Sequence, residues 1–415
     1  MTKTDFRPFV PAPGTSRIAG SSARAHAEAV TQIDSVIGLL AFWKKLFTAP
    51  FTGLTTGGSP LPGLFSLREE DAPVQNAARA ATWLLSRMTV AERAKACFDV
   101  TSDQWRNWQN TEIFVESHGL RLEELATPTR DAIMAVIKAS LSARGYEKTW
   151  NTMRLNRVLG DLVGGAAVMN EWSYIFCLFG EPSTEAPWGW QLFGHHLALN
   201  CLFIGGQMVV SPIFLGAEPT YADDGSHKGL HEFQDEERKG LGFMLSLSEA
   251  QKAQALIANS LVGGDLPEGR RQFADGLHLG GAYQDNRIVP YEGLRGDTLE
   301  AAQQKTLLDL TEEYLSILPE GPLAARITDI ETHLADTHFC WIGNEQENKP
   351  FYYRIQSPVI LIEFDHHAGV YLTNTEPANF HVHTLVRTPN GNDYGIDLIR
   401  QHYESAGHHQ HAENT

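Results

Sequence analysis

The sequence predicts an α+β fold, in which a helical N-terminal part precedes a largely antiparallel sheet with packed helices. Apolar residues recur at helical spacing in much of the first 143 residues. From Trp188 onward, apolar runs bounded by turn formers are typical of strands. The last strands are joined by segments too short for a helical crossover, which favours antiparallel pairing.

The first expected helix covers residues 25–47, where Ile33, Ile37, Leu40 and Trp43 follow helical spacing. Glycine and proline are frequent from 50 to 63 and end the pattern. We therefore expect residues 1–65 to form a helical extension on a Gly/Pro-rich tether. The apolar stripe of this helix must pack on the main domain or on another subunit, so the chain is expected to be a homo-oligomer.

Further helices are expected at residues 73–88, 129–143, 235–261 and 298–318. Between them, residues 190–204 and 207–215 read as two strands around Gly205 and Gly206, which suit a tight hairpin. Four more strands are expected at 338–342, 351–356, 359–366 and 380–387. The His-rich residues 406–415 are expected to be a flexible tail.

The composition excludes several classes of partner. There are 33 Lys and Arg against 50 Asp and Glu, a formal charge of -17, so nucleic acid and anionic membrane surfaces are not expected partners. No apolar run approaches the about 20 residues that span a bilayer, and the N-terminus has no apolar leader. A cytoplasmic location is the expectation. Four scattered cysteines favour free thiols over a disulfide framework.

The most informative residues lie in the last predicted strands. Alternate residues of a strand share a face, so His381, His383 and Arg387 should point one way, and Glu363, Asp365 and His367 should also lie together. Two imidazoles at i and i+2 can reach one ion, or they can simply cap a sheet edge. The nearby Asp365 cluster favours the metal.

A second histidine pair, His195 and His196, lies within the predicted strand 190–204. Adjacent strand residues face opposite ways, so only one of the two can point into a given site, and the pattern does not say which. The same ambiguity holds for His366 and His367. All six histidines, His195, His196, His366, His367, His381 and His383, therefore remain candidate metal ligands, with hydrogen-bonded structural histidines as the alternative.

Three further residues are candidates for catalysis. Asp365 could be a ligand or could orient an imidazole. Arg387 could bind a carboxylate of the substrate in a bidentate manner, or it could pair with Glu363 or Asp365. Asp393 lies in a turn-rich segment, 388–395, next to a strand end, where functional residues often occur. We expect a small, anionic substrate.

Four stretches, residues 189–197, 352–355, 363–367 and 381–395, resemble the signature segments of the domain of unknown function 3500 family. The resemblance covers about residues 90–405 and implies a single α+β domain, which we place at 66–405. It implies no activity.

The site residues predict a metal-dependent enzyme, first of all a hydrolase in which a divalent ion activates water. Zinc is favoured, and iron or copper also fit histidine ligands, which would suit an oxygenase. A non-catalytic metal or small-molecule binding protein is the third alternative.

Overall fold

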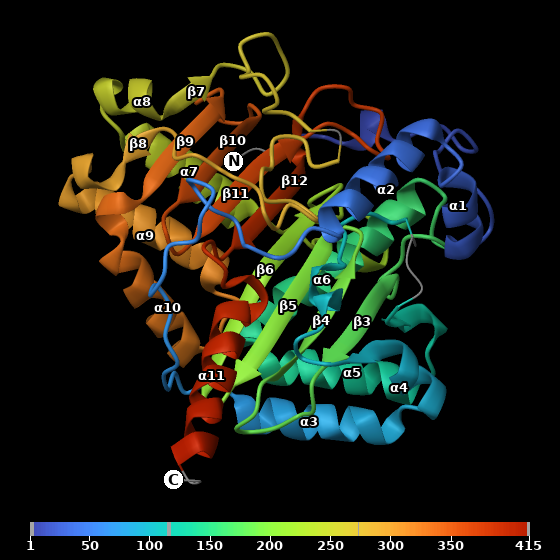
Figure 1. Cartoon of the computed structure of the whole chain (residues 1–415). Helices are drawn as coiled ribbons and strands as arrows, with labels where there is room; N and C mark the ends of the chain where they lie inside the picture. Colours follow the sequence, from blue (N-terminus) through green and yellow to red (C-terminus); the bar gives the residue numbers. More distant parts are fainter. Residues whose placement is uncertain (1–3, 114–117, 273, 413–415) are drawn as a thin grey trace.

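The protein has an α+β fold, as the sequence predicts (Figure 1). The computed structural model describes residues 4–113, 118–272 and 274–412. Its centre is a single twelve-stranded sheet, and the strands run antiparallel except where β1 pairs with β3 and β7 pairs with β9.

The helices of the described residues are α1 Ala23–Val30, α2 Asp34–Phe47, α3 Val74–Arg87, α4 Val90–Ala96, α5 Thr127–Ser140, α6 Ala143–Leu162, α7 Gln234–Ser246, α8 Glu249–Ala255, α9 Ala301–Leu315, α10 Glu320–Thr332 and α11 Ile396–Ala412. Short 3₁₀ helices lie at Arg7–Phe9, Asp103–Arg106, Leu122–Glu124, Gly225–His227, Gly296–Thr298, Leu334–Asp336 and Asp393–Gly395. None of the helices in the described part of the chain is long and apolar enough to span a membrane.

The strands are β1 Cys97–Phe98, β2 Leu120–Arg121, β3 Tyr174–Phe179, β4 Trp188–Gly194, β5 Leu197–Ile204, β6 Gln207–Ala217, β7 Leu256–Ala258, β8 Leu294–Arg295, β9 His338–Gly343, β10 Phe351–Gln356, β11 Leu361–His367 and β12 Ala378–Arg387. They are ordered β1-β3-β4-β5-β6-β12-β11-β10-β9-β7, with β2 on β3 and β8 on β9. Two antiparallel blocks, β3 to β6 and β9 to β12, therefore meet where β6 pairs with β12.

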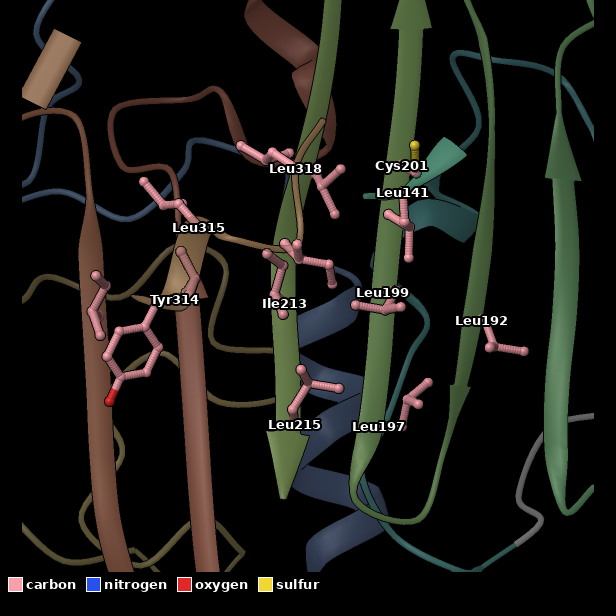
Figure 2. Packing of buried hydrophobic residues seen from close by; sticks show 14 of the residues in the cluster. Leu141, Leu192, Leu197, Leu199, Cys201, Ile213, Leu215, Tyr314, Leu315 and Leu318 are labelled. Atoms are coloured by element: carbon pink, nitrogen blue, oxygen red, sulfur yellow. The ribbon is translucent and has the colours of Figure 1, made fainter. Parts of the chain in front are cut away.

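Both faces of the sheet are covered. Helices α3, α5, α6, α7 and α9 contribute to one large apolar core with the first face. Figure 2 shows part of this layer, in which Leu192, Leu199 and Ile213 lie on three neighbouring strands and Leu315 and Leu318 lie on the side of Ile213. The second face is covered by α2, by part of α11 and by irregular segments of the chain. A sheet buried on both sides explains why its strands are nearly continuous apolar runs.

The predicted hairpin at Gly205 and Gly206 is confirmed, because Ile204 pairs with Gln207 across a two-residue turn. The four predicted C-terminal strands are confirmed as β9 to β12. The predicted helices at 73–88 and 129–143 correspond to α3 and α5.

Other boundaries differ from the prediction. Residues 25–47 form two helices, α1 and α2, and residues 235–261 contain α7, α8 and the short strand β7. The prediction of one strand over 190–204 was wrong, since the chain reverses at His195 and His196 between β4 and β5. His196 takes a positive φ of 61°, which the strand pattern did not indicate because such turns usually carry glycine or asparagine.

Helix α2 packs on the second face of the sheet through Trp43, which is buried with Tyr283 stacked on it. Its opposite side is apolar and exposed: Ile33 beside its N-terminus is 51% exposed, Ile37 49% and Phe42 44%. The stripe predicted for this segment is therefore only partly covered within one chain, and the homo-oligomer remains a prediction.

Candidate metal centre

The candidate centre lies where the two halves of the sheet meet. His381 and His383 are on β12, and both side chains belong to the second face of the sheet, as does that of Leu385. His383 pairs across the sheet with Asp365 of β11 on one side and Gly216 of β6 on the other. His381 and His383 thus share a face, as predicted, and the pairing of β11 with β12 brings Asp365 beside His383.

The turn between β4 and β5 adds a third histidine. The main-chain N–H of His196 donates to the Asn110 carbonyl at 3.1 Å, and its carbonyl accepts from the Gly216 N–H at 2.8 Å. These two bonds fix a turn residue whose ring then reaches β12, 185 residues further along the chain.

The three imidazoles converge. His381 Nε2 lies 3.1 Å from His383 Nε2 and 3.3 Å from His196 Nε2. Tetrahedral zinc with Zn–N bonds of about 2.0 to 2.1 Å separates its nitrogen ligands by about 3.3 Å. Among the described residues, these three form the one group of His, Cys, Asp or Glu side chains whose ligand atoms all lie within 4.8 Å of one another. The three side chains could hold one metal ion.

Hydrogen bonding sets the orientation of His381. Its Nδ1 lies 2.8 Å from the Ala368 carbonyl, an acceptor, so Nδ1 carries the proton and the Nε2 lone pair faces the other two rings. His367 Nδ1 lies 3.0 Å from the same carbonyl. Outer hydrogen bonds of this kind orient metal-binding histidines in known sites.

Glu218 holds the segment that carries this carbonyl. Its carboxylate, at the end of β6, accepts from the main-chain N–H groups of residues 370, 371 and 372 at 2.9 to 3.2 Å. It also lies 3.8 Å from His381 Nδ1. Burial raises the pKa of Glu218 to about 7, although the hydrogen bonds from these three N–H groups act to lower it. No pattern in the sequence indicated this residue.

The imidazoles are suited to bind a cation because they are neutral. Burial lowers the pKa of His196, His381 and His383 well below the ordinary value, and the neighbouring histidines lower it further. Metal ligation requires the unprotonated ring. The three residues are 3%, 0% and 5% exposed, so the centre is enclosed by protein.

A glycine makes room for two of the rings. A Cβ on Gly216 would lie 2.9 Å from the His383 ring and 2.7 Å from the Val382 carbonyl. Any larger residue at this position would therefore push His383 or the strand itself out of place.

Asp365 and His367 border the triad. Asp365 Oδ1 lies 4.0 Å from His383 Nδ1, whereas the converging nitrogen of that ring is Nε2. The carboxylate therefore faces the outer nitrogen of His383 without a hydrogen bond, and it does not lie among the converging nitrogens. The His367 ring lies 4.6 Å from that of His383 and 4.9 Å from that of His381, and His367 is more exposed than the triad.

Two of the predicted histidines lie elsewhere. His195 Nδ1 contacts Asn156 Oδ1 at 2.8 Å, and its ring stacks on His196 rather than facing the centre. His366 is on the other face of the sheet, where its Nδ1 accepts from the Phe351 N–H at 3.0 Å. The structure thus separates the members of each adjacent pair, which the sequence could not do.

Arg387 is on the predicted face of β12 but its guanidinium is engaged inside the protein. It donates to Asp285 at 2.8 Å, to Asp393 at 3.0 Å, and to the carbonyls of Gly280 and Gly281 at 2.8 and 3.1 Å. The alternative of an ion pair with Glu363 or Asp365 was wrong. Asp393 belongs to the same buried network, and neither residue is brought to the triad.

The sequence also gave no sign of His278, whose Nε2 is 3.5 Å from Asp365 Oδ1. It lies in an irregular glycine-rich segment, residues 276–281, between Gly276 and Gly280. Without a strand or helix period, nothing in the sequence indicated which way this side chain points.

A family model described as "Protein of unknown function (DUF3500)" matches residues 70–396. The chain belongs to this family. The resemblance seen in the signature segments is confirmed, and all three triad histidines lie within the matched range. Neither a curated protein nor a solved structure matched the chain.

Proposed function

We propose that this protein is a metal-dependent hydrolase, in which an ion held by His196, His381 and His383 activates a water molecule. One observation carries the proposal: three neutral, buried imidazoles converge with Nε2 separations of 3.1 and 3.3 Å, as ligands of one ion do. Catalytic zinc sites commonly use three protein ligands and keep a fourth position for water.

The ligand set favours zinc over non-haem iron. The iron oxygenases bind their metal through two histidines and one carboxylate. Here the candidate carboxylate, Asp365, lies beside the outer nitrogen of His383 at 4.0 Å and not among the converging nitrogens. Three histidines also suit copper, so a copper oxygenase is the second candidate. A non-catalytic metal-binding protein is the third.

His367 is the residue we assign to proton transfer in this reaction. Its Nδ1 is held by the Ala368 carbonyl, so its Nε2 can accept a proton. Its ring lies 4.6 Å from that of a proposed ligand. A histidine so placed can take a proton from metal-bound water and later donate it to a leaving group.

Arg387 is not assigned to a substrate carboxylate, because its four hydrogen bonds all go to groups of the protein itself. We therefore still propose a small-molecule substrate, but we no longer propose that it is anionic.

Elemental analysis of the purified protein tests the proposal. We expect zinc in the wild type, and loss of most of the triad ion in His383→Ala, because removing one of three ligands abolishes tight coordination. The matched control is His366→Ala. It removes a buried histidine of the neighbouring strand β11 on the opposite face of the sheet, and it should keep the ion.

Hydrolysis of a panel of activated esters and amides should depend on zinc and be lost in His383→Ala. In His367→Gln the ion should stay while hydrolysis falls, since general acid-base catalysis contributes about 10² to 10⁴-fold. Full metal occupancy in His383→Ala would contradict the metal centre. Copper in the purified protein, with oxygen consumption, would favour the oxygenase.

A further inference from the structure

A second group of buried polar side chains lies next to the triad. It consists of Asp365, His278 and Asp275, which are 1%, 0% and 1% exposed. His278 Nε2 lies 3.5 Å from Asp365 Oδ1, and Asp365 faces His383 across the pairing of β11 with β12. The group therefore adjoins the metal centre without belonging to it.

Five atoms of this group have no hydrogen-bond partner among the described residues. They are both carboxylate oxygens of Asp275, both ring nitrogens of His278, and Oδ1 of Asp365. Buried polar atoms are nearly always paired in folded proteins, so an unpaired set of this size indicates a bound ion or water. A neutral imidazole has a free lone pair on only one of its two ring nitrogens. Four of the five atoms can therefore accept a hydrogen bond or bind a cation at the same time.

A neighbouring carboxylate shows that the fold can pair such groups when no ligand is needed. Glu363, also on β11, accepts from the N–H groups of Leu279 and Gly280 at 2.8 to 2.9 Å and from the Tyr352 hydroxyl at 2.7 Å. Its charge is compensated by protein donors. Asp275 and Asp365, in the same region, lack such donors for the oxygens named above.

Asp275 is buried against Gly281. A Cβ on Gly281 would lie 2.3 Å from the carboxylate carbon of Asp275, so only glycine leaves room for this side chain. The segment around Gly281 is anchored in turn, because its carbonyl and that of Gly280 accept from Arg387. The carboxylate is thus an internal group and not a solvated surface acid.

We propose that Asp275, His278 and Asp365 bind a second divalent cation beside the triad. Carboxylate oxygens with one imidazole suit a harder ion than three imidazoles do, such as Mn²⁺ or Mg²⁺. Among the described residues, only the triad brings three ligand atoms within 4.8 Å of one another. The ligand atoms of Asp275, His278 and Asp365 are therefore spread more widely than those of the triad. An ion with bonds of about 2.0 to 2.1 Å cannot contact all three groups at that width, so it keeps part of its water shell, and at least one of the three groups holds it through a coordinated water.

The consequence for catalysis rests on the proposed function. The second ion would lie beyond the outer nitrogen of His383, with that ring between it and the triad ion, so it would act on the electrostatics of the centre and not on the reacting oxygens. Asp365 would then link the two positions, because its Oδ1 lies 3.5 Å from His278 Nε2 and 4.0 Å from His383 Nδ1.

Metal stoichiometry tests the second site. Zinc-loaded protein is titrated with Mn²⁺ while free Mn²⁺ is followed by electron paramagnetic resonance, and total metal is measured by mass spectrometry. We expect about two ions per chain in the wild type. His278→Ala and Asp275→Asn should each retain about one, and His381→Ala should lose the triad ion while keeping the other.

This pattern separates the two proposals. Loss of an ion in His278→Ala with none lost in His381→Ala would refute the triad and keep the second site. The second site would be overturned if the wild type bound one ion that is lost in His381→Ala and kept in His278→Ala and Asp275→Asn. Water would then be the partner of the unpaired atoms of Asp275, His278 and Asp365.

Thermal unfolding guards against a merely structural effect. In chelator, Asp275→Asn should be at least as stable as the wild type, because it removes a buried carboxylate without a partner. With Mn²⁺ present, the wild type should gain stability by mass action and the variant should gain much less. An equal loss of stability in chelator and in Mn²⁺ would make Asp275 a structural residue and overturn its assignment as a ligand.

Discussion

Replacing Arg387 with leucine should destabilise the protein strongly. The side chain is fully buried and donates four hydrogen bonds, two of them to the carboxylates of Asp285 and Asp393. Leucine fills much of the space but leaves both carboxylates without their shared cation. Removing one partner of a buried ion pair typically costs about 3 to 5 kcal/mol.

The remaining contacts of the two carboxylates favour the lower part of that range. Asp285 still accepts from Arg106 at 3.0 Å and from the Tyr394 hydroxyl at 2.8 Å. Asp393 still accepts from the Ser211 hydroxyl at 2.7 Å and from the Thr388 N–H at 2.8 Å. We therefore expect a loss of about 3 to 4 kcal/mol.

This loss translates into a measurable shift of the melting temperature. An unfolding entropy of about 2.1 cal/mol/K per residue, over 415 residues, gives about 0.9 kcal/mol/K if the chain unfolds as one unit. The melting temperature should then fall by about 4 °C. The effect should shrink at acid pH, because burial already raises the pKa of Asp393 and an unpaired carboxyl would take up a proton more readily.

Differential scanning calorimetry of Arg387→Leu is the direct assay. The matched control is Arg400→Leu on α11, whose side chain is 57% exposed and pairs with Asp397 and Glu404, and which should change the melting temperature little. An Arg387→Leu variant that melts within about a degree of the wild type would refute the structural role. It would also reopen the carboxylate-binding role predicted from the sequence.

Three further outcomes are expected. Gly216→Ala should reduce zinc retention by about tenfold or more, because the added Cβ meets the His383 ring and the strand; equal retention would contradict the crowding. The free energy of unfolding should fall as the pH drops from about 6.5 to 4, because burial lowers the pKa of His118 to about 4 and the unfolded chain therefore binds the proton first. This residue should account for up to about 3 kcal/mol of the loss. In thermal melts, His118→Phe should flatten this part of the pH profile. Deleting residues 1–48 should shift the species in light scattering if the exposed stripe of α2 is a subunit interface, and an unchanged monomer before and after would argue against the oligomer.

Much of the local structure could be predicted from the sequence. Apolar runs bounded by turn formers predicted β9 to β12, and the two-residue period of a strand placed His381 and His383 on one face, with Asp365 close by in the sequence. The glycine pair at 205 and 206 located the β5–β6 turn. These inferences succeed because strand geometry and turn geometry depend on neighbouring residues.

Which residues form the centre depends on the order of the strands in the sheet and on the turn between β4 and β5. His196 joins the triad only because β6 pairs with β12 and because a turn, not a strand, occurs at His195 and His196. His278 lies beside Asp365 and comes from an irregular segment that has no period. Arg387 faces the side that the sequence predicts, yet its partners come from residues 280–285 and 393. Contacts between residues far apart in the chain are set by sheet order and by the packing of the whole core, and no local pattern encodes them.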